Sequence, residues 1–81
     1  MRTPENSSDT ISTKVLHLVV NGLPRRFPVG TTALDVVQDL GFEQRPIAVE
    51  VNERVIRRVE LNACMLSDGD CLEIVTLVGG G

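Results

Sequence analysis

The dipeptide Asn21-Gly22 restricts the fold of this chain more than any other feature of its sequence. It separates two runs rich in apolar and β-branched residues, 14–20 and 23–29. A two-residue hairpin needs left-handed backbone angles at both turn positions, and Asn and Gly adopt these most readily. We therefore predict an antiparallel hairpin. Its second strand contains Pro24 and Pro28, which cannot donate ladder hydrogen bonds, so it should lie at a sheet edge or be irregular at its ends.

A helix of about three turns is predicted over residues 32–40. Thr32 is suited to cap its start, and Asp35 falls in the first turn, where the helix dipole favours a negative charge. Gly41 is suited to the left-handed position that follows a helix end. The apolar face is expected to consist of Leu34, Val37 and Leu40, widened by Ala33 and Val36.

Three further strands are predicted after the helix. They span residues 47–51, 54–57 and 71–77, and the segment 59–66 is either a loop or one short helical turn. Elements in this order form a two-layer α+β domain, in which one main helix packs across one face of a mixed sheet. This is the ubiquitin-like β-grasp fold, expected over residues 14–77. The residues expected to be largely buried are Leu16, Leu18, Val20, Leu34, Val37, Leu40, Val49, Val51, Leu72 and Ile74.

Composition narrows the possible functions. The 81 residues suffice for one domain but leave little room for a deep substrate pocket, which disfavours an independent enzyme. The net charge of −3, with eleven acidic and eight basic residues, disfavours nucleic-acid binding. No apolar run is long enough to span a membrane, and no signal peptide is visible, so a cytoplasmic protein is expected. Residues 1–13 are polar and are expected to form a disordered arm.

The glycines Gly79, Gly80 and Gly81 follow the last predicted strand directly. Because glycine lacks Cβ, residues 78–81 would form a narrow, flexible tail, mobile when free, that could thread into the active site of another protein. The tail would present a carboxylate there with no side chain in the way. A carboxylate is a poor electrophile, so ATP would have to activate it as an acyl-adenylate. The alternative is a frayed terminus without a role.

From residue 14 to residue 81 the chain resembles the ThiS family of sulfur carriers. The resemblance lies in the order and spacing of several short pieces rather than in any one of them. The pieces are Val20-Asn21-Gly22, Gly30-Thr31-Thr32 leading into Leu34, Leu40-Gly41, Ala48-Val49, Val51-Asn52-Glu53, Val55-Ile56, Gly69-Asp70, Glu73-Ile74-Val75 and Val78-Gly79-Gly80-Gly81.

The resemblance implies a protein co-substrate rather than an enzyme, with no bound cofactor of its own. A ubiquitin-activating-like adenylyltransferase would use ATP and Mg²⁺ to adenylate Gly81, while Gly79 and Gly80 thread into that partner. A sulfurtransferase or cysteine desulfurase system would then supply sulfur to form a thiocarboxylate. Thiazole synthase would take this sulfur for the thiazole ring of thiamine.

Two other functions remain open at this point. The small subunit of molybdopterin synthase also ends in two glycines and carries a thiocarboxylate, but its segment before the glycines usually includes prolines and aromatic residues. Residues 74–78 of this chain include neither, which favours the thiamine carrier. A ubiquitin-like modifier joined to lysines would use the same tail.

A docking surface for partners is predicted beside the tail. If Leu72 and Ile74 face the core, then neighbouring apolar residues of the last strand face outward next to the glycines. Family members often have a Pro-Arg pair where this chain has two arginines, which could also contact a partner. The candidate docking residues are Val75, Leu77, Val78, Arg57 and Arg58.

The remaining polar residues and the cysteines are expected to have ordinary roles. Cys64 and Cys71 lack a CxxC spacing and a nearby histidine, so they should be small hydrophobic residues rather than metal ligands or sulfur relays. His17 should be solvated, without a thiol or hydroxyl to activate. Asp68 and Asp70 belong to an expected turn. No metal site is predicted.

Overall fold

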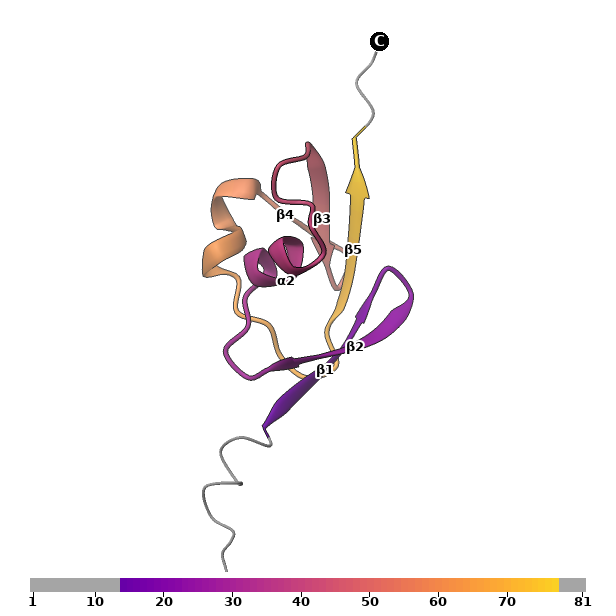
Figure 1. Cartoon of the computed structure of the whole chain (residues 1–81), viewed down its shortest axis with the longest axis vertical. Helices are drawn as coiled ribbons and strands as arrows, with labels where there is room; N and C mark the ends of the chain where they lie inside the picture. Colours follow the sequence, from indigo (N-terminus) through magenta and orange to yellow (C-terminus); the bar gives the residue numbers. More distant parts are fainter. Residues whose placement is uncertain (1–13, 78–81) are drawn as a thin grey trace, which may run out of the picture.

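The last strand, β5, occupies the centre of a five-stranded sheet. The computed structural model describes residues 14–77. The elements are β1 (Val15–Val20), β2 (Leu23–Pro28), α2 (Ala33–Asp39), β3 (Ile47–Val51), β4 (Arg54–Ile56), the 3₁₀ helix η1 (Arg58–Ala63) and β5 (Cys71–Thr76). The strand order is β2-β1-β5-β3-β4 (Figure 1). Only the β1–β5 pair is parallel, so the sheet is mixed, as the β-grasp prediction requires.

Both hairpin turns in this part of the chain use left-handed backbone. Asn21 and Gly22 have φ angles of 51° and 83°, and they join β1 to β2 as predicted. The turn between β3 and β4 has φ angles of 51° at Asn52 and 70° at Glu53. Glutamate seldom adopts this conformation, because its Cβ crowds the backbone there. The prediction that β2 is an edge strand is confirmed.

The ends of α2 are fixed by its local sequence. The hydroxyl of Thr32 accepts the N–H of Asp35 at 3.2 Å, and the Asp35 carboxylate accepts the N–H of Thr32 at 2.9 Å. At the other end Gly41 has φ 81°, and the N–H of Phe42 donates to the carbonyl of Val37 at 3.0 Å, which closes a Schellman motif. Both predicted ends are confirmed. The helix has seven residues, about two turns, and is shorter than expected.

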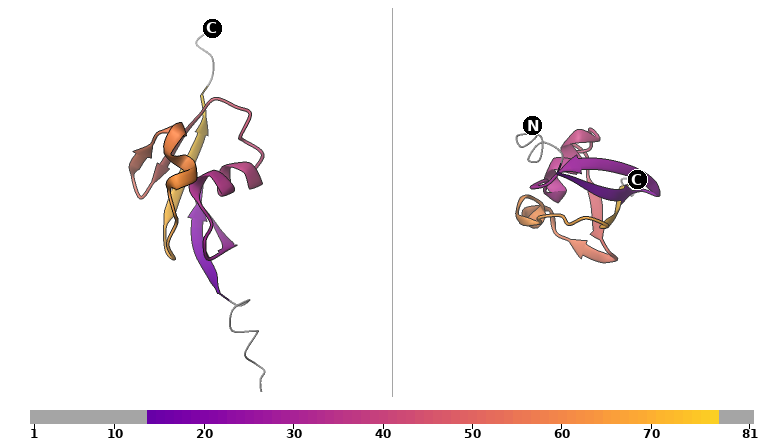
Figure 2. Two further views of the ribbon diagram at one scale, coloured as in Figure 1. Left: turned by 90° about the vertical axis from the view of Figure 1, so that its left-hand side faces the viewer. Right: turned by 90° about the horizontal axis from the view of Figure 1, so that it is seen from below.

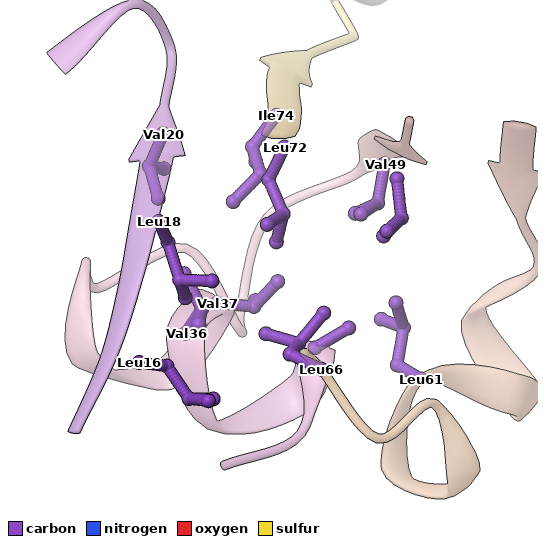
Figure 3. Close-up of a cluster of buried hydrophobic side chains, with 12 residues drawn as sticks. Leu16, Leu18, Val20, Val36, Val37, Val49, Leu61, Leu66, Leu72 and Ile74 are labelled. Atoms are coloured by element: carbon purple, nitrogen blue, oxygen red, sulfur yellow. The ribbon is translucent and has the colours of Figure 1, made fainter. Parts of the chain in front are cut away.

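The core lies between the sheet and α2, and Figure 3 shows its side chains converging from both. Every strand residue predicted to be buried is buried, and so is Val37. The prediction was wrong for Leu34 and Leu40, which are only partly buried and pack against the core from its margin. The N–H of Ala33 donates to the carbonyl of Cys64 at 2.9 Å. This contact helps to turn the small residues Ala33 and Val36 inward, and both are fully buried.

The segment after β4 supplies core residues that the sequence did not reveal. Of the two predicted alternatives the helical one holds, because η1 forms a short 3₁₀ helix. Leu61 in η1 and Leu66 after it are 1% and 3% exposed and belong to the core. In Figure 2, η1 and α2 lie on the same side of the sheet. Within residues 14–77 no helix covers the opposite face of the sheet.

Candidate functional site

The end of β5 is the described part of the chain closest to the predicted reactive tail. The N–H of Leu77 donates to the carbonyl of Pro46 at 2.8 Å, so the β3–β5 ladder extends to the last described residue. Val78 and residues 79–81 lie outside the described residues, so their predicted mobility stays a prediction. Residues 1–13 and their predicted disorder also lie outside them.

Arg58 anchors the loop that flanks this base. Its guanidinium donates to the carbonyl oxygens of Glu43 and Arg45. These residues lead directly to Pro46, the partner of Leu77. Arg58 thus connects η1 to the loop that fixes the end of β5. A docking role for Arg58 stays a prediction beside this structural one.

Arg57 is exposed next to it, and its main-chain N–H donates to the carboxylate of Glu60 at 3.3 Å. No described contact engages its guanidinium, so its side chain is available to a partner. Its docking role also stays a prediction.

Apolar side chains, exposed except for the half-buried Ala48, lie on the sheet face opposite α2 and extend toward the base of the tail. Val75 and Leu77 are 53% and 52% exposed, as expected for residues that alternate with the buried Leu72 and Ile74. The register places Ala48 opposite Val75, and on the next strand Val55 points to the same side. We call these four residues, Ala48, Val55, Val75 and Leu77, the outer patch.

Carboxylates border the outer patch. Glu50 and Glu73 lie directly opposite each other on β3 and β5. Like charges in this arrangement repel each other and weaken the strand pairing. Together with Glu53, they line a shallow hollow that also includes Asn52 and Cys71. This side of the sheet is therefore suited to a partner surface that carries positive charge.

Two turn asparagines fasten β5 to its neighbours. The amide of Asn21 donates to the carbonyl of Ile74 at 3.0 Å and accepts the Ile74 N–H at 2.7 Å. The amide oxygen of Asn52 accepts the N–H of Cys71 at 2.9 Å, and its nitrogen donates to the carboxylate of Asp70 at 2.9 Å. The sequence predicted both turns, but not that their side chains would reach β5, because the partners are distant in the chain.

His17 is exposed, as expected, and it pairs with Asp68. The Asp68 carboxylate accepts the His17 main-chain N–H at 2.6 Å and lies 3.1 Å from Nδ1 of the ring. Hydrogen bonding by the main chain and then by the ring of His17 lowers the pKa of Asp68. Asp70 accepts the N–H of Ser67 at 2.7 Å, which confirms the turn expected there. These contacts attach the loop before β5 to β1.

Cys71 lies far from the base of the tail. Cys71 begins β5, about 20 Å from Leu77 at ~3.3 Å per residue. Cys64 is partly buried, and burial, then the charge of Asp70, raises the pKa of its thiol, which makes it a poorer nucleophile.

Residues 14–77 hold no group of three His, Cys, Asp or Glu side chains placed to bind a metal ion. In the same range no helix is long and apolar enough to cross a membrane.

The sheet is mixed, has the strand order β2-β1-β5-β3-β4, and carries one main helix across one face. This arrangement places the protein in the class of ubiquitin-like β-grasp proteins. Within this class the chain belongs to the ThiS family, whose family model matches residues 18–81. The resemblance seen in the sequence is thus confirmed.

The chain is similar to known proteins of two kinds, small ThiS proteins and much longer thiazole synthases. It is 37% identical to the sulfur carrier protein ThiS of Thermus thermophilus, over 76% of this chain and 95% of that protein. It is 36% identical to a thiazole synthase of Paramagnetospirillum magneticum over 82% of this chain, but it spans only 20% of that protein. The crystal structure of the thiamine biosynthesis protein ThiS from Geobacter metallireducens superposes with a TM-score of 0.70, at 29% identity. That match covers 82% of this chain and all of the other.

Proposed function

We propose that this protein is a sulfur carrier of thiamine biosynthesis and that the carboxylate of Gly81 carries the sulfur. Membership of the ThiS family supports the proposal most directly, because the match runs through residue 81. The domain itself offers little for catalysis: the described residues form a filled core and shallow surface hollows. Its role is to present the tail, as a co-substrate of other enzymes.

The chemistry begins with activation of the carboxylate. In the active site of a ubiquitin-activating-like adenylyltransferase, a Gly81 carboxylate oxygen attacks the α-phosphorus of ATP, which is bound with Mg²⁺, and pyrophosphate leaves. A persulfide sulfur from a sulfurtransferase or cysteine desulfurase system then attacks the acyl carbon and AMP leaves. A thiol cleaves the resulting acyl disulfide, so that the thiol and the sulfurtransferase become oxidised and a thiocarboxylate remains. Gly79 and Gly80 form the narrow segment that enters these sites.

Thiazole synthase is the proposed acceptor of the sulfur. The matches to two thiazole synthases, each over about a fifth of their length, support this partner, because domains that act together are often found in one chain. The outer patch with its bordering Glu50 and Glu73 would dock the adenylyltransferase. An exposed apolar surface this close to the tail buries apolar area on binding, and the carboxylates favour a basic rim on the enzyme.

Intact mass spectrometry tests the proposal. After incubation with the adenylyltransferase of the same organism, ATP, Mg²⁺ and a sulfur donor, the chain should gain the mass difference between one sulfur and one oxygen. A chain amidated at Gly81 is the matched control and should gain nothing. If the amidated chain gains sulfur, the carboxylate is not the acceptor. Adducts on lysines of the other proteins in the mixture would instead indicate a protein modifier.

The position of the carboxylate provides a second test. Reacting atoms must approach within ~3–3.5 Å, and one extended residue spans about the same length. Deleting Gly81, or adding one residue after it, should therefore abolish most ATP–pyrophosphate exchange. A deletion variant that exchanges at the parental rate would contradict the assignment of Gly81.

A further inference from the structure

A hollow lies beside the end of β5, between the loop that leads into β3 and the start of η1. It has a volume of about 380 Å³ and is lined by residues 43–47 together with Arg58 and Leu77. In Figure 2 the loop between α2 and β3 reaches the end of β5, where Leu77 bonds to Pro46. Three segments that are distant in the sequence therefore form this hollow, which we call the arginine hollow.

Two guanidinium groups of the arginine hollow are held in place by contacts that leave most of their donors unused. The guanidinium of Arg58 bonds to the carbonyls of Glu43 and Arg45 through Nη2 alone, so the N–H groups of Nε and Nη1 remain. The guanidinium of Arg45 lies over the ring of Phe42, 6.0 Å from its centre. No contact among residues 14–77 uses the remaining N–H groups of either arginine.

Neither arginine is neutralised by a carboxylate of the described chain. Within residues 14–77 the only ion pair joins His17 to Asp68, on β1 and the loop before β5. Glu43 also lines the arginine hollow, but it accepts from Arg58 through its main-chain carbonyl, and its carboxylate pairs with neither guanidinium. The arginine hollow thus carries two positive charges whose natural counterpart is an external anion.

The rest of the arginine hollow is largely apolar. Its lining includes Pro46, the half-buried Ile47 and Leu77, which is 52% exposed. A simple anion such as phosphate would pair with the arginines but leave these apolar side chains in water. A carboxylate that adjoins an aliphatic side chain would cover both parts. The lining therefore favours a peptide over an inorganic ion.

We propose that the arginine hollow binds an acidic segment of a partner protein, in which a carboxylate side chain adjoins an aliphatic one. The carboxylate pairs with Arg45 and with the unused donors of Arg58, and the aliphatic side chain packs on Ile47 and Leu77. Because both guanidinium groups are already held, binding has to order less of each side chain. This interaction is separate from the sulfur chemistry and does not depend on it.

The arginine hollow and the outer patch meet at Leu77 but favour partners of opposite charge. Glu50 and Glu73 border the outer patch, whereas Arg45 and Arg58 line the arginine hollow. A basic partner surface that covers the outer patch would be repelled at the arginine hollow. An acidic segment is therefore the chemistry that distinguishes this site from the neighbouring surface.

A short synthetic peptide tests the inference on the full chain. Acetyl-Leu-Glu-Glu-Leu-amide is titrated into the ¹⁵N-labelled protein, and the main-chain amide signals are followed by NMR. The signals of Arg45, Ile47 and Leu77 should shift and saturate, with a dissociation constant on the order of 1 mM, as expected for exposed ion pairs. The matched peptide with glutamine in place of both glutamates should bind at least about threefold more weakly. Raising the salt concentration should also weaken binding of the acidic peptide.

Arg45→Gln is the most informative variant, because the Arg45 side chain contacts only the ring of Phe42 and anchors no loop. Its amide spectrum should show a folded domain, while its affinity for the acidic peptide should fall about three- to fivefold, as expected for the loss of one exposed ion pair. Arg25→Gln is the matched control. Arg25 is exposed on β2, at the far edge of the sheet, and its loss should leave the affinity unchanged.

Four results would overturn the inference. The peptide may shift only signals outside the arginine hollow, or the glutamine peptide may bind equally well. Inorganic phosphate that shifts the same signals with the affinity of the peptide would make the hollow a simple anion site. A free chain that self-associates, and no longer does so as Arg45→Gln, would assign the hollow to a second copy. A chain that gains sulfur but fails these tests keeps its carrier function, and a chain that passes them without gaining sulfur keeps the peptide site.

Discussion

Replacing Asn21 with glycine should destabilise the domain through β5 rather than through the hairpin turn. Glycine adopts the φ of 51° without strain, so the turn remains possible. The substitution removes the two part-buried hydrogen bonds to Ile74, of 3.0 and 2.7 Å. At ~1 kcal/mol for each bond, the free energy of unfolding should fall by about 2 kcal/mol. For a domain of this size that corresponds to a melting temperature lower by roughly 8–16 °C.

Asn52→Gly is the matched control. Asn52 has the same φ of 51° and also makes two side-chain hydrogen bonds, but they are exposed, so their loss should cost about 1 kcal/mol or less. The changes in backbone strain and chain entropy are nearly the same for both variants. Urea unfolding measures the difference, and deuterium exchange locates it, since only Asn21→Gly should expose the Ile74 amide. Equal losses in the two variants, or a protected Ile74 amide in Asn21→Gly, would refute the role assigned to Asn21.

Other substitutions test the core, the second turn and the loop before β5. Leu61→Ala should lower the free energy of unfolding by ~3 kcal/mol in urea denaturation, whereas Leu34→Ala, at a partly buried position, should cost less than about 2 kcal/mol. Glu53→Gly should stabilise the domain by about 0.5 kcal/mol, because relief of the strain at φ 70° exceeds the greater entropy of glycine in the unfolded chain. The hydrogen bonds from His17 lower the pKa of Asp68 below its ordinary 3.8 in the folded state, so their stabilising effect is present above pH 3.8 and is lost as the pH falls through the lowered pKa. Asp68→Asn should therefore be less stable at neutral pH and should lose less stability on acidification, as followed by thermal melts from pH 7 to acid.

The features that could be predicted from the sequence are those that depend on near neighbours. The turn at Asn21 needs only two residues with left-handed angles, and the helix ends need only Thr32, Asp35 and Gly41. The alternation of buried residues in β1 and β5 follows from the two-residue period of a strand. In each case the cause lies within a few positions of its effect. Such features form largely independently of the rest of the chain.

The features that were missed depend on contacts between distant segments. Leu61 is buried because η1 packs against α2, and nothing near Leu61 in the sequence specifies that contact. Leu34 was expected inside, but the contact between Ala33 and Cys64 helps to direct other helix residues to the sheet. Arg58 was predicted only as a possible partner contact, and its contacts with the loop at Glu43 became visible only in the fold.

Contacts on both sides of β5 hold the base of the tail, and the two residues they hold lie three positions apart. On one side the loop anchored by Arg58 holds Leu77 through Pro46, and on the other the side chain of Asn21 holds Ile74. The backbone from Ile74 to Leu77, which leads to the proposed reactive carboxylate, is therefore already fixed by the domain. An enzyme must bring this carboxylate within ~3–3.5 Å of its target, so each bond already fixed by the domain is one that the enzyme need not order. On this reasoning a loosened β5 would impair activation even where the domain stays folded, and the tail alone, as a free peptide, would be a poor substrate.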